Sequence, residues 1–127
     1  MFKILIIDEC SLFRQSLQQI LCSRFAGVVI ETAGDKLDGW KKAGTLLPHI
    51  IFVDIHMQGE TGRELVKTLK MDQPGVPLVV FTRYDLPEYQ IAARQAGADH
   101  SLPRDNFTGD QLLRLVENIL SGQDINA

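Results

Sequence analysis

The most constraining feature of this sequence is a regular alternation of two kinds of segment. Short, almost wholly apolar runs alternate with longer stretches in which apolar residues recur at helical spacing. Runs that are apolar at successive positions, and not only at every second one, are typical of strands covered on both faces in a parallel sheet. We place these strands at residues 3–8, 28–32, 49–54 and 76–82, with a weaker fifth at 98–102.

Five helices are predicted from apolar stripes with the spacing of one helix face. The stripe of the second helix is thinner than the others. The stripes comprise Phe13, Leu17, Ile20 and Leu21; Leu37, Trp40, Gly44 and Leu47; Leu65, Val66 and Leu69; Ile91, Ala92 and Ala96; and Leu112, Leu115, Val116, Ile119 and Leu120.

Start and stop signals agree with these helices. Serine, aspartate and threonine favour the position before a helix, and glycine favours the position after it. The start signals are Ser11, Asp85 with Glu88, Pro87, and Thr108 with Gln111, and the stop signals are Gly97 and Gly122.

Five strand-then-helix units predict an α/β fold with a doubly wound five-stranded parallel sheet. At this length the natural strand order is 2-1-3-4-5, as in flavodoxin-like folds. We expect one domain over residues 1–122 and a short C-terminal tail at 123–127. In such a fold, ligands bind at the carboxyl ends of the strands.

The composition excludes several classes of protein. The net charge of −3 argues against direct nucleic-acid binding by this segment, because such surfaces are basic. No apolar run approaches the length of a membrane span. Cys10 and Cys22 form no C-x-x-C pair, and the histidines have no metal-ligand spacing. We therefore expect reduced thiols in a cytoplasmic protein, without a zinc site.

Chemically active side chains stand at the predicted strand ends. Asp8 and Glu9 end the first strand, and Asp54 ends the third. Thr82 ends the fourth strand, and Arg104 follows the fifth. Taken singly, each aspartate is more often a loop cap. As a set on one rim, they predict a Mg²⁺ and phosphoryl site, because Mg²⁺ prefers oxygen ligands and phosphoryl transfer needs charge neutralisation.

These residues give the chain a resemblance to response-regulator receiver domains, the phosphoacceptor domains of two-component signalling. It covers residues 3 to 122. The motifs are "IIDE" (6–9), "VDIHMQGETG" (53–62), Thr82, and "AGADHSLPRD" (96–105). The segment "DECSLFRQSLQQIL" (8–21) resembles receivers of the subfamily that often carries a C-terminal helix-turn-helix DNA-binding domain.

The resemblance implies a role for each matching residue. Asp54 would be the phosphoacceptor, with Mg²⁺ held by Asp8, Glu9, Asp54 and the backbone carbonyl of His56, and Thr82 would donate a hydrogen bond to the phosphoryl group. The partner would be a histidine kinase or phosphotransfer protein, and phosphorylation would change partner binding or drive a homodimer. Such a domain catalyses its own phosphotransfer and dephosphorylation, and is not a conventional enzyme.

Three positions depart from the family pattern. Arg104 stands where the family usually has lysine, and Ser101 replaces an aromatic residue. Arg83 follows Thr82, where the family commonly has a small residue. It would add a second cation to the site, hinder a phosphodonor, or remain a solvated loop charge. Tyr84 and His56 match positions that line the approach of hydrolytic water, so we expect Tyr84 to slow phosphoryl loss.

Two other functions stay open. The departures at Arg83, Ser101 and Arg104 would suit an interaction module that works without phosphorylation. A small flavodoxin-like enzyme or nucleotide binder is disfavoured, because "DECSLFRQ" after the first strand contains no glycine for a phosphate loop. We also predict that the peptide bond after Arg104 is trans, since Asp105 follows it and not proline.

Overall fold

The computed structural model describes residues 2–57 and 61–122. Its strands are β1 (Lys3–Ile7), β2 (Val29–Ala33), β3 (Ile50–Asp54), β4 (Leu78–Thr82) and β5 (His100–Pro103). Its helices are α1 (Ser11–Arg24), α2 (Lys36–Leu46), α3 (Thr61–Asp72), α4 (Pro87–Ala96) and α5 (Gly109–Ser121). The predicted tail, 123–127, lies outside the described residues.

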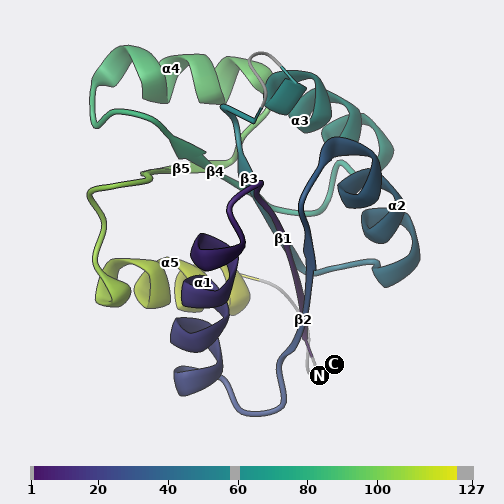
Figure 1. Cartoon of the computed structure of the whole chain (residues 1–127), viewed down its shortest axis with the longest axis vertical. Coiled ribbons are helices and arrows are strands. Elements are labelled where there is room, and N and C mark those ends of the chain that lie inside the picture. Colours follow the sequence, from purple (N-terminus) through teal and green to yellow (C-terminus); the bar gives the residue numbers. More distant parts are fainter. Residues whose placement is uncertain (1, 58–60, 123–127) are drawn as a thin grey trace.

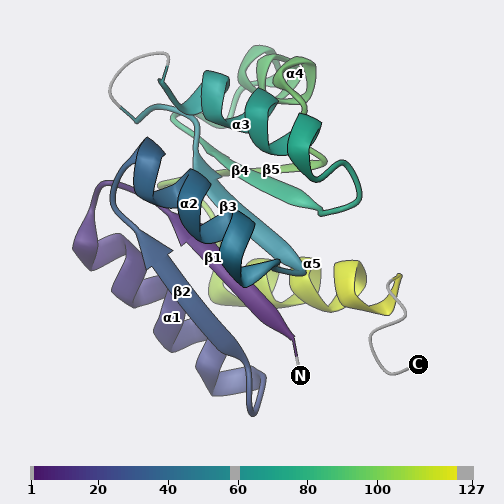
Figure 2. The same cartoon turned by 90° about the vertical axis from the view of Figure 1, so that its right-hand side faces the viewer.

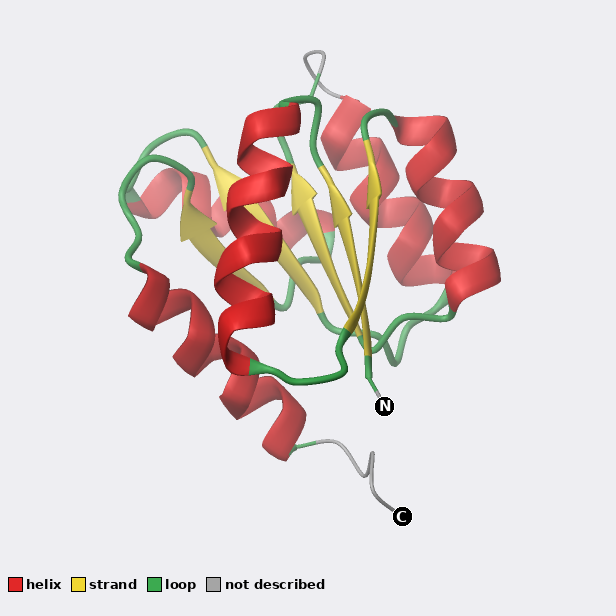
Figure 3. Cartoon of the chain, turned by 60° about the horizontal axis from the view of Figure 1, so that its bottom comes forward, coloured by secondary structure: helices red, strands yellow, loops and turns green. Residues whose placement is uncertain are grey.

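The five strands form one parallel sheet in the order β2-β1-β3-β4-β5. The predicted fold and strand order are therefore confirmed. Figure 3 shows the strands running in the same direction, so that their carboxyl ends share one rim of the sheet. The β1, β3 and β4 strands occupy the centre, and their apolar residues are almost fully buried.

Helices cover both faces of the sheet. One core lies between the sheet and α2, α3 and α4, and a second lies between the sheet and α1 and α5. Figure 1 shows α3 and α4 on one side of the strands and α1 and α5 on the other, and Figure 2 shows the same layers from the side. Successive residues of a strand point to opposite faces of the sheet, so each central strand contributes side chains to both cores. This explains why the central strands are apolar at every position.

The weak fifth run is the edge strand β5. Only one neighbour, β4, pairs with it, and its last pair joins Thr82 to Pro103. Proline has no N–H to donate, and an edge strand tolerates that loss. The chain has no cis peptide bond among its described residues, so the trans bond predicted after Arg104 is confirmed.

The apolar stripe predicted for α2 lies on the wrong face. Leu37, Trp40 and Leu47 are 59%, 46% and 63% exposed, whereas Gly39 and Ala43 are the buried residues of the helix. The helix packs so closely that a Cβ on Gly39 would lie 2.7 Å from Cδ1 of Ile7. Small residues make this close packing against β1, so the larger apolar residues remain outside. Ile91 of α4 is likewise 56% exposed.

Two of the predicted start signals are wrong and two are confirmed. The α1 helix begins at Ser11 itself, with Cys10 before it and no side-chain cap. The α4 helix begins at Pro87 after Leu86, again without a side-chain cap, so Asp85 is not a cap. Pro87 at the first turn is confirmed, as is the capping box of Thr108 and Gln111.

Asp85 has other partners: its carboxylate accepts hydrogen bonds from the amides of Gln90 and Asn106. The stop signals are confirmed as helix ends. Gly97 ends α4 with a φ of 119°, and Gly122 ends α5 in the ordinary right-handed region. No helix among residues 2–57 and 61–122 combines the length and apolar character that crossing a membrane requires.

Candidate functional site

The carboxyl ends of the strands surround an open cavity of about 340 Å³. It lies where β1 and β3, which are neighbours in the sheet, lead into connections on opposite faces. This is the position at which doubly wound folds bind ligands. The cavity is lined by Asp8, Glu9, Cys10, Asp54, His56, Arg83, Arg104 and Asp105.

Asp8 lies immediately after β1 and is only 1% exposed. Its backbone N–H donates to the carbonyl of Ala33, which extends the pairing of β1 with β2 by one residue. Its Oδ1 accepts the Cys10 N–H at 2.8 Å and Nη2 of Arg104 at 3.1 Å. Its Oδ2 accepts Nη1 of Arg104. A buried carboxylate with a bidentate guanidinium partner is well satisfied, so Asp8 is held in one position.

Arg104 reaches this pair from the end of β5. Its backbone N–H donates to the Thr82 carbonyl at 2.8 Å, which extends the pairing of β4 with β5. Its Nη1 also lies 3.6 Å from Oδ2 of Asp54. Burial works to lower the pKa of Arg104, but its hydrogen bond to Asp8 and the charges of Asp8 and Asp54 outweigh burial and raise that pKa.

Asp54 ends β3, between Asp8 and the loop that leads to α3. Its Oδ1 accepts the backbone N–H of His56 at 3.0 Å. Burial raises the pKa of Asp54, and the nearby charge of Asp8 acts in the same direction. The His56 N–H and the charge of Arg104 oppose that shift without cancelling it. The carboxylate is therefore more basic than an ordinary aspartate, which favours attack on an electrophile.

Thr82 is at the end of β4 but does not line the cavity. It is 2% exposed, and its hydroxyl lies 3.2 Å from the carbonyl oxygen of Tyr84 and 3.5 Å from that of Leu102. Both partners belong to the strand ends and loop around it. The hydroxyl thus donates within its own surroundings and is not hydrogen-bonded to Asp54.

His56 and Arg83 both line the cavity. Burial lowers the pKa of His56, and the charge of Arg83 lowers it further. The Nε2 atom of His56 is buried and has no hydrogen-bond partner among the described residues. The ring packs at 6.1 Å from that of Tyr89, which in turn lies 5.3 Å from Tyr84.

Of the nine site residues named from the sequence, six line the cavity and three do not. Thr82 lies buried behind the rim, Tyr84 is half exposed beside Tyr89, and Ser101 lies half-buried in β5 opposite Val80. The sequence argument missed Cys10 and Asp105, although they stand three and two positions beyond the ends of β1 and β5. It also missed Tyr89, whose signal was an aromatic side chain in the first turn of α4.

Phe13 also contributes to the site, which the sequence argument did not predict. Its spacing indicated only that it lies on the core face of α1. Its ring packs on Phe81, with 5.0 Å between centroids, and the guanidinium of Arg104 lies 3.9 Å above its centre. Phe13 thus belongs both to the core and to the site. The available signal was its place in the first turn of α1, which follows the end of β1 closely and therefore lies near the rim.

The carboxylates of the cavity suit a hard cation such as Mg²⁺, because they offer oxygen ligands. Within residues 2–57 and 61–122, no three side chains of Asp, Glu, His or Cys form a group that could hold a metal ion. Mg²⁺ requires fewer, since it keeps several waters and takes one or two carboxylates. Asp8 and Asp54 supply these, with Glu9 on the same wall. Arg104 competes with the metal ion for the oxygens of Asp8.

The curated proteins that this chain resembles in sequence are response regulators and transcriptional regulators. LnrK of Bacillus subtilis, a transcriptional regulatory protein, is 30% identical over 122 residues, which are 96% of this chain and 55% of LnrK. Response regulator MprA of Mycobacterium ulcerans is 28% identical over 93% of this chain and 50% of its own length. NtrC of Escherichia coli, a DNA-binding transcriptional regulator, is 28% identical over 91% of this chain and 24% of NtrC. The chain thus spans about half or less of these relatives.

Solved structures show the same fold. A response regulator receiver domain protein (CheY-like) of Methanospirillum hungatei superposes with a TM-score of 0.85 at 25% identity, covering 100% of this chain and 99% of that one. Chemotaxis response regulator CheY4 of Vibrio cholerae gives 0.82 at 28% identity, covering 94% and 98%. The model of the response regulator receiver domain family matches residues 4–117. The chain therefore belongs to the response regulator receiver domain family of two-component signalling.

Proposed function

We propose that this domain is a phosphorylation switch in which Asp54 accepts a phosphoryl group from a histidine kinase or phosphotransfer protein. The observation that carries this proposal is the position of Asp54 in the cavity. Its Oδ1 is held by the His56 N–H, and its Oδ2 lies 3.6 Å from the cationic Arg104. A basic carboxylate beside a cation is suited to attack on phosphorus, because the cation offsets the repulsion between the nucleophile and the phosphoryl group.

The transfer step uses one oxygen of Asp54 as the nucleophile. That oxygen forms a bond to phosphorus while the bond between phosphorus and the donor nitrogen breaks, and the electron pair of that bond stays with the donor. The product is an acyl phosphate. When bound by Asp8, Glu9, Asp54 and the His56 carbonyl, Mg²⁺ supplies charge neutralisation for the phosphoryl oxygens.

The surrounding residues would adjust the switch. Thr82 would donate to the phosphoryl group only after its hydroxyl leaves the carbonyls of Tyr84 and Leu102. Arg83 lines the cavity and would add a second cation. Tyr84 packs beside the aromatic ring that contacts His56, so these rings would restrict the approach of hydrolytic water. Ser101 supplies no aromatic ring at its position of β5 that could move with Thr82.

The names of the relatives indicate what the phosphorylated domain would control. LnrK is named as a transcriptional regulatory protein and NtrC as a DNA-binding transcriptional regulator. We extend the proposal to transcriptional control through a C-terminal DNA-binding domain, with residues 1–122 as the receiver and a homodimer as one form of the active state. The net charge of −3 supports an indirect role, in which the receiver itself does not bind DNA. The switch would work in the cytoplasm, where free Cys10 and Cys22 stay reduced.

A mass measurement tests the phosphoacceptor. The protein is incubated with Mg²⁺ and acetyl phosphate, and its intact mass is compared for wild type, Asp54→Ala and Asp105→Ala. Asp105 is the matched control, because it is a carboxylate of the same cavity. We expect one phosphoryl adduct on wild type and Asp105→Ala and none on Asp54→Ala. Absence of an adduct with every small donor would contradict the proposal and favour a phosphorylation-independent interaction module.

A further inference from the structure

The contacts that Arg104 makes with Phe13 and Asp8 form a cluster whose aromatic member has no part in the proposed phosphotransfer. The guanidinium of Arg104 contacts two groups: it lies 3.9 Å from the centre of the Phe13 ring, and it is paired with the carboxylate of Asp8. Arg104 is only 22% exposed and Asp8 only 1%. A cation over an aromatic face is held more firmly when water is excluded, so Phe13 adds to the ion pair on which it is stacked.

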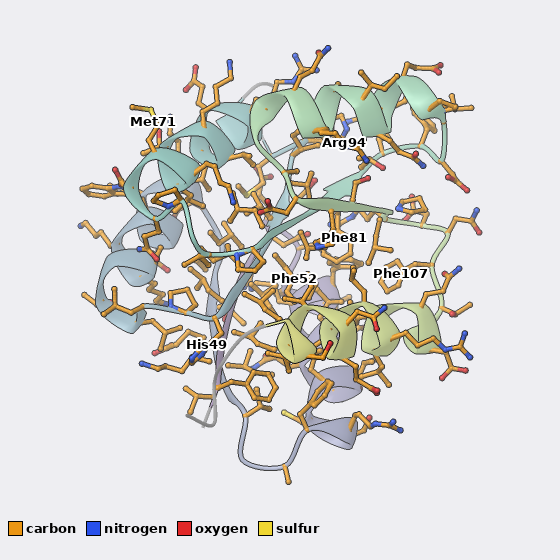
Figure 4. The ribbon with its side chains drawn as sticks, turned by 180° about the vertical axis from the view of Figure 1, so that it is seen from behind. His49, Phe52, Met71, Phe81, Arg94 and Phe107 are labelled. Carbon is orange, nitrogen blue, oxygen red and sulfur yellow. The ribbon has the colours of Figure 1, made fainter. Side chains whose placement is uncertain are left out.

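The ring of Phe13 is itself fixed. It meets Phe81 edge to face at 89° and Phe107 at 84°. Figure 4 labels Phe52, Phe81 and Phe107, which lie together between the sheet and α5. Their ring centres are 5.8 Å apart for Phe52 and Phe81 and 5.5 Å apart for Phe81 and Phe107. A ring held on two sides presents one unchanging face to Arg104.

The Arg104–Asp8 pair uses oxygens that a metal ion would need. Oδ1 of Asp8 accepts hydrogen bonds from Cys10 and Arg104, and Oδ2 accepts one from Arg104. The guanidinium competes with a divalent cation for Asp8, because the three hydrogen bonds leave one acceptor site on Oδ2 and the positive charge of Arg104 repels the metal ion. Lysine would leave more room, since an ammonium group is compact and does not bind both oxygens in one plane. Asp54, 3.6 Å from Nη1, is the adjacent carboxylate to which a displaced guanidinium can move.

We propose that Phe13 is a positioning residue that holds Arg104 on Asp8 as an internal counterion and thereby weakens Mg²⁺ binding at the cavity. This inference rests on the proposed function, because it concerns the same site. Binding of Mg²⁺ then displaces the guanidinium from both Asp8 and the ring of Phe13, so that it turns towards Asp54. That movement uncovers Phe13 in the core between the sheet, α1 and α5. The state of the cavity is thus transmitted to the α1 and α5 side of the sheet, although Ser101 supplies no aromatic ring on β5.

The test is Mg²⁺ affinity, measured by isothermal titration calorimetry on the unphosphorylated full chain. We expect Phe13→Leu to bind Mg²⁺ about three- to tenfold more tightly than wild type, the change that corresponds to loss of a partly desolvated cation–π contact. Phe52→Leu is the matched control, because it removes a ring of the same cluster that packs on Phe81 and contacts neither Phe13 nor Arg104. It should leave Mg²⁺ affinity unchanged. Equal effects of the two substitutions would show a merely structural role and overturn the inference.

A double-mutant cycle keeps the inference falsifiable if Phe13→Leu is destabilising. Arg104→Gln removes the cation, so Mg²⁺ affinity should rise in that variant, and Phe13→Leu should then have no further effect on it. A full Phe13→Leu effect in the Arg104→Gln background overturns the inference, as does unchanged affinity in both single variants. Either result overturns the role of Phe13 alone, because the proposed function is tested separately by the phosphoryl adduct on Asp54. Failure of every variant to bind Mg²⁺, together with no adduct on Asp54, overturns the proposed function as well.

Discussion

At the scale of single residues, Gly39 determines where α2 sits. Its Cα faces Ile7 of β1, and a Cβ there would lie 2.7 Å from Cδ1 and 2.9 Å from Cγ2 of that side chain. Ile7 is completely buried and β-branched, so it has little freedom to move away. The lack of a side chain at residue 39 is therefore a packing requirement, although glycine weakens a helix.

We predict opposite effects for two glycine substitutions in α2. Gly39→Ala should lower the free energy of unfolding by about 1–3 kcal/mol, because overpacking against Ile7 exceeds the gain in helix propensity. Gly44→Ala should raise it by about 0.5–1 kcal/mol, since nothing lies within 4 Å of the added Cβ and the position is exposed. Urea unfolding of both variants checks this. A stabilised Gly39→Ala protein would contradict the close packing of α2.

The site was predictable in part at this scale. Asp8, Asp54 and Arg104 could be placed together because strand ends in a parallel sheet share one rim. Their chemical roles stay predictions. The direction of the Thr82 hydroxyl and the contact of Arg104 with Phe13 could not be foreseen, because both depend on side-chain torsions that spacing does not encode. Phe13 fits the core stripe of α1 equally well with or without a cation above it.

At the scale of elements, the helix starts show why local signals succeed or fail. Thr108 caps α5, with its hydroxyl accepting the Gln111 N–H at 3.1 Å while the Gln111 side chain accepts the Thr108 N–H at 2.9 Å. At α1 the same kind of signal failed. Asp8 accepts the Cys10 N–H, the helix begins one residue earlier than a Ser11 cap requires, and Ser11 becomes its first residue.

This difference predicts the outcome of two alanine substitutions. Thr108→Ala should lower the free energy of unfolding by about 1 kcal/mol, because the hydroxyl that accepts the Gln111 N–H is lost. Ser11→Ala should change it by less than about 0.5 kcal/mol, since Ser11 makes no cap. Thermal denaturation of the two variants provides the measurement. A larger loss for Ser11→Ala than for Thr108→Ala would show that the helix starts are assigned wrongly.

The α2 helix marks the limit of pattern analysis for an element. Its large apolar residues form a stripe, but the stripe is on the exposed side, because small residues packed against the sheet are energetically better there than large ones. Hydrophobic spacing cannot distinguish these two faces when glycine and alanine line one of them.

At the scale of the whole molecule, the order of elements was the most predictable property. Alternating strands and helices leave few chain topologies, since crossovers between parallel strands are right-handed. The exact extent of the sheet was less predictable. The two edge strands carry exposed residues, such as Glu31 in β2 and His100 in β5, which weakens their apolar signal.

The stability of the whole domain should depend on pH through His49. This ring stands before β3 and its Nδ1 accepts the backbone N–H of Lys3 at 3.0 Å, which ties the amino ends of β1 and β3 together. Burial lowers the pKa of His49, and the charge of Lys3 lowers it further. Since the unfolded state binds the proton more tightly, the stabilisation is present above the unfolded pKa of 6.5 and is lost as the pH falls through the folded pKa.

We therefore predict that His49→Asn becomes more stable relative to wild type as the pH falls from about 7 to about 5. Asparagine keeps an acceptor oxygen close to the position of Nδ1 but does not gain a proton. Urea midpoints of the two proteins across this pH range give the comparison, in which the remaining histidines cancel. A constant difference between the two midpoints would show that His49 does not titrate differently on folding.

The ending of β5 at Pro103 also bears on how copies of this domain can associate. An exposed edge strand can form hydrogen bonds with a strand of another chain. A short edge strand that ends in proline has few N–H groups for such pairing. The opposite edge, β2, exposes the charged Glu31. Continuous intermolecular sheets are thus disfavoured at both edges, and helical faces are left as the surfaces through which two domains can meet. A dimer formed in this way can dissociate when its signal ends, whereas a shared sheet would tend to grow.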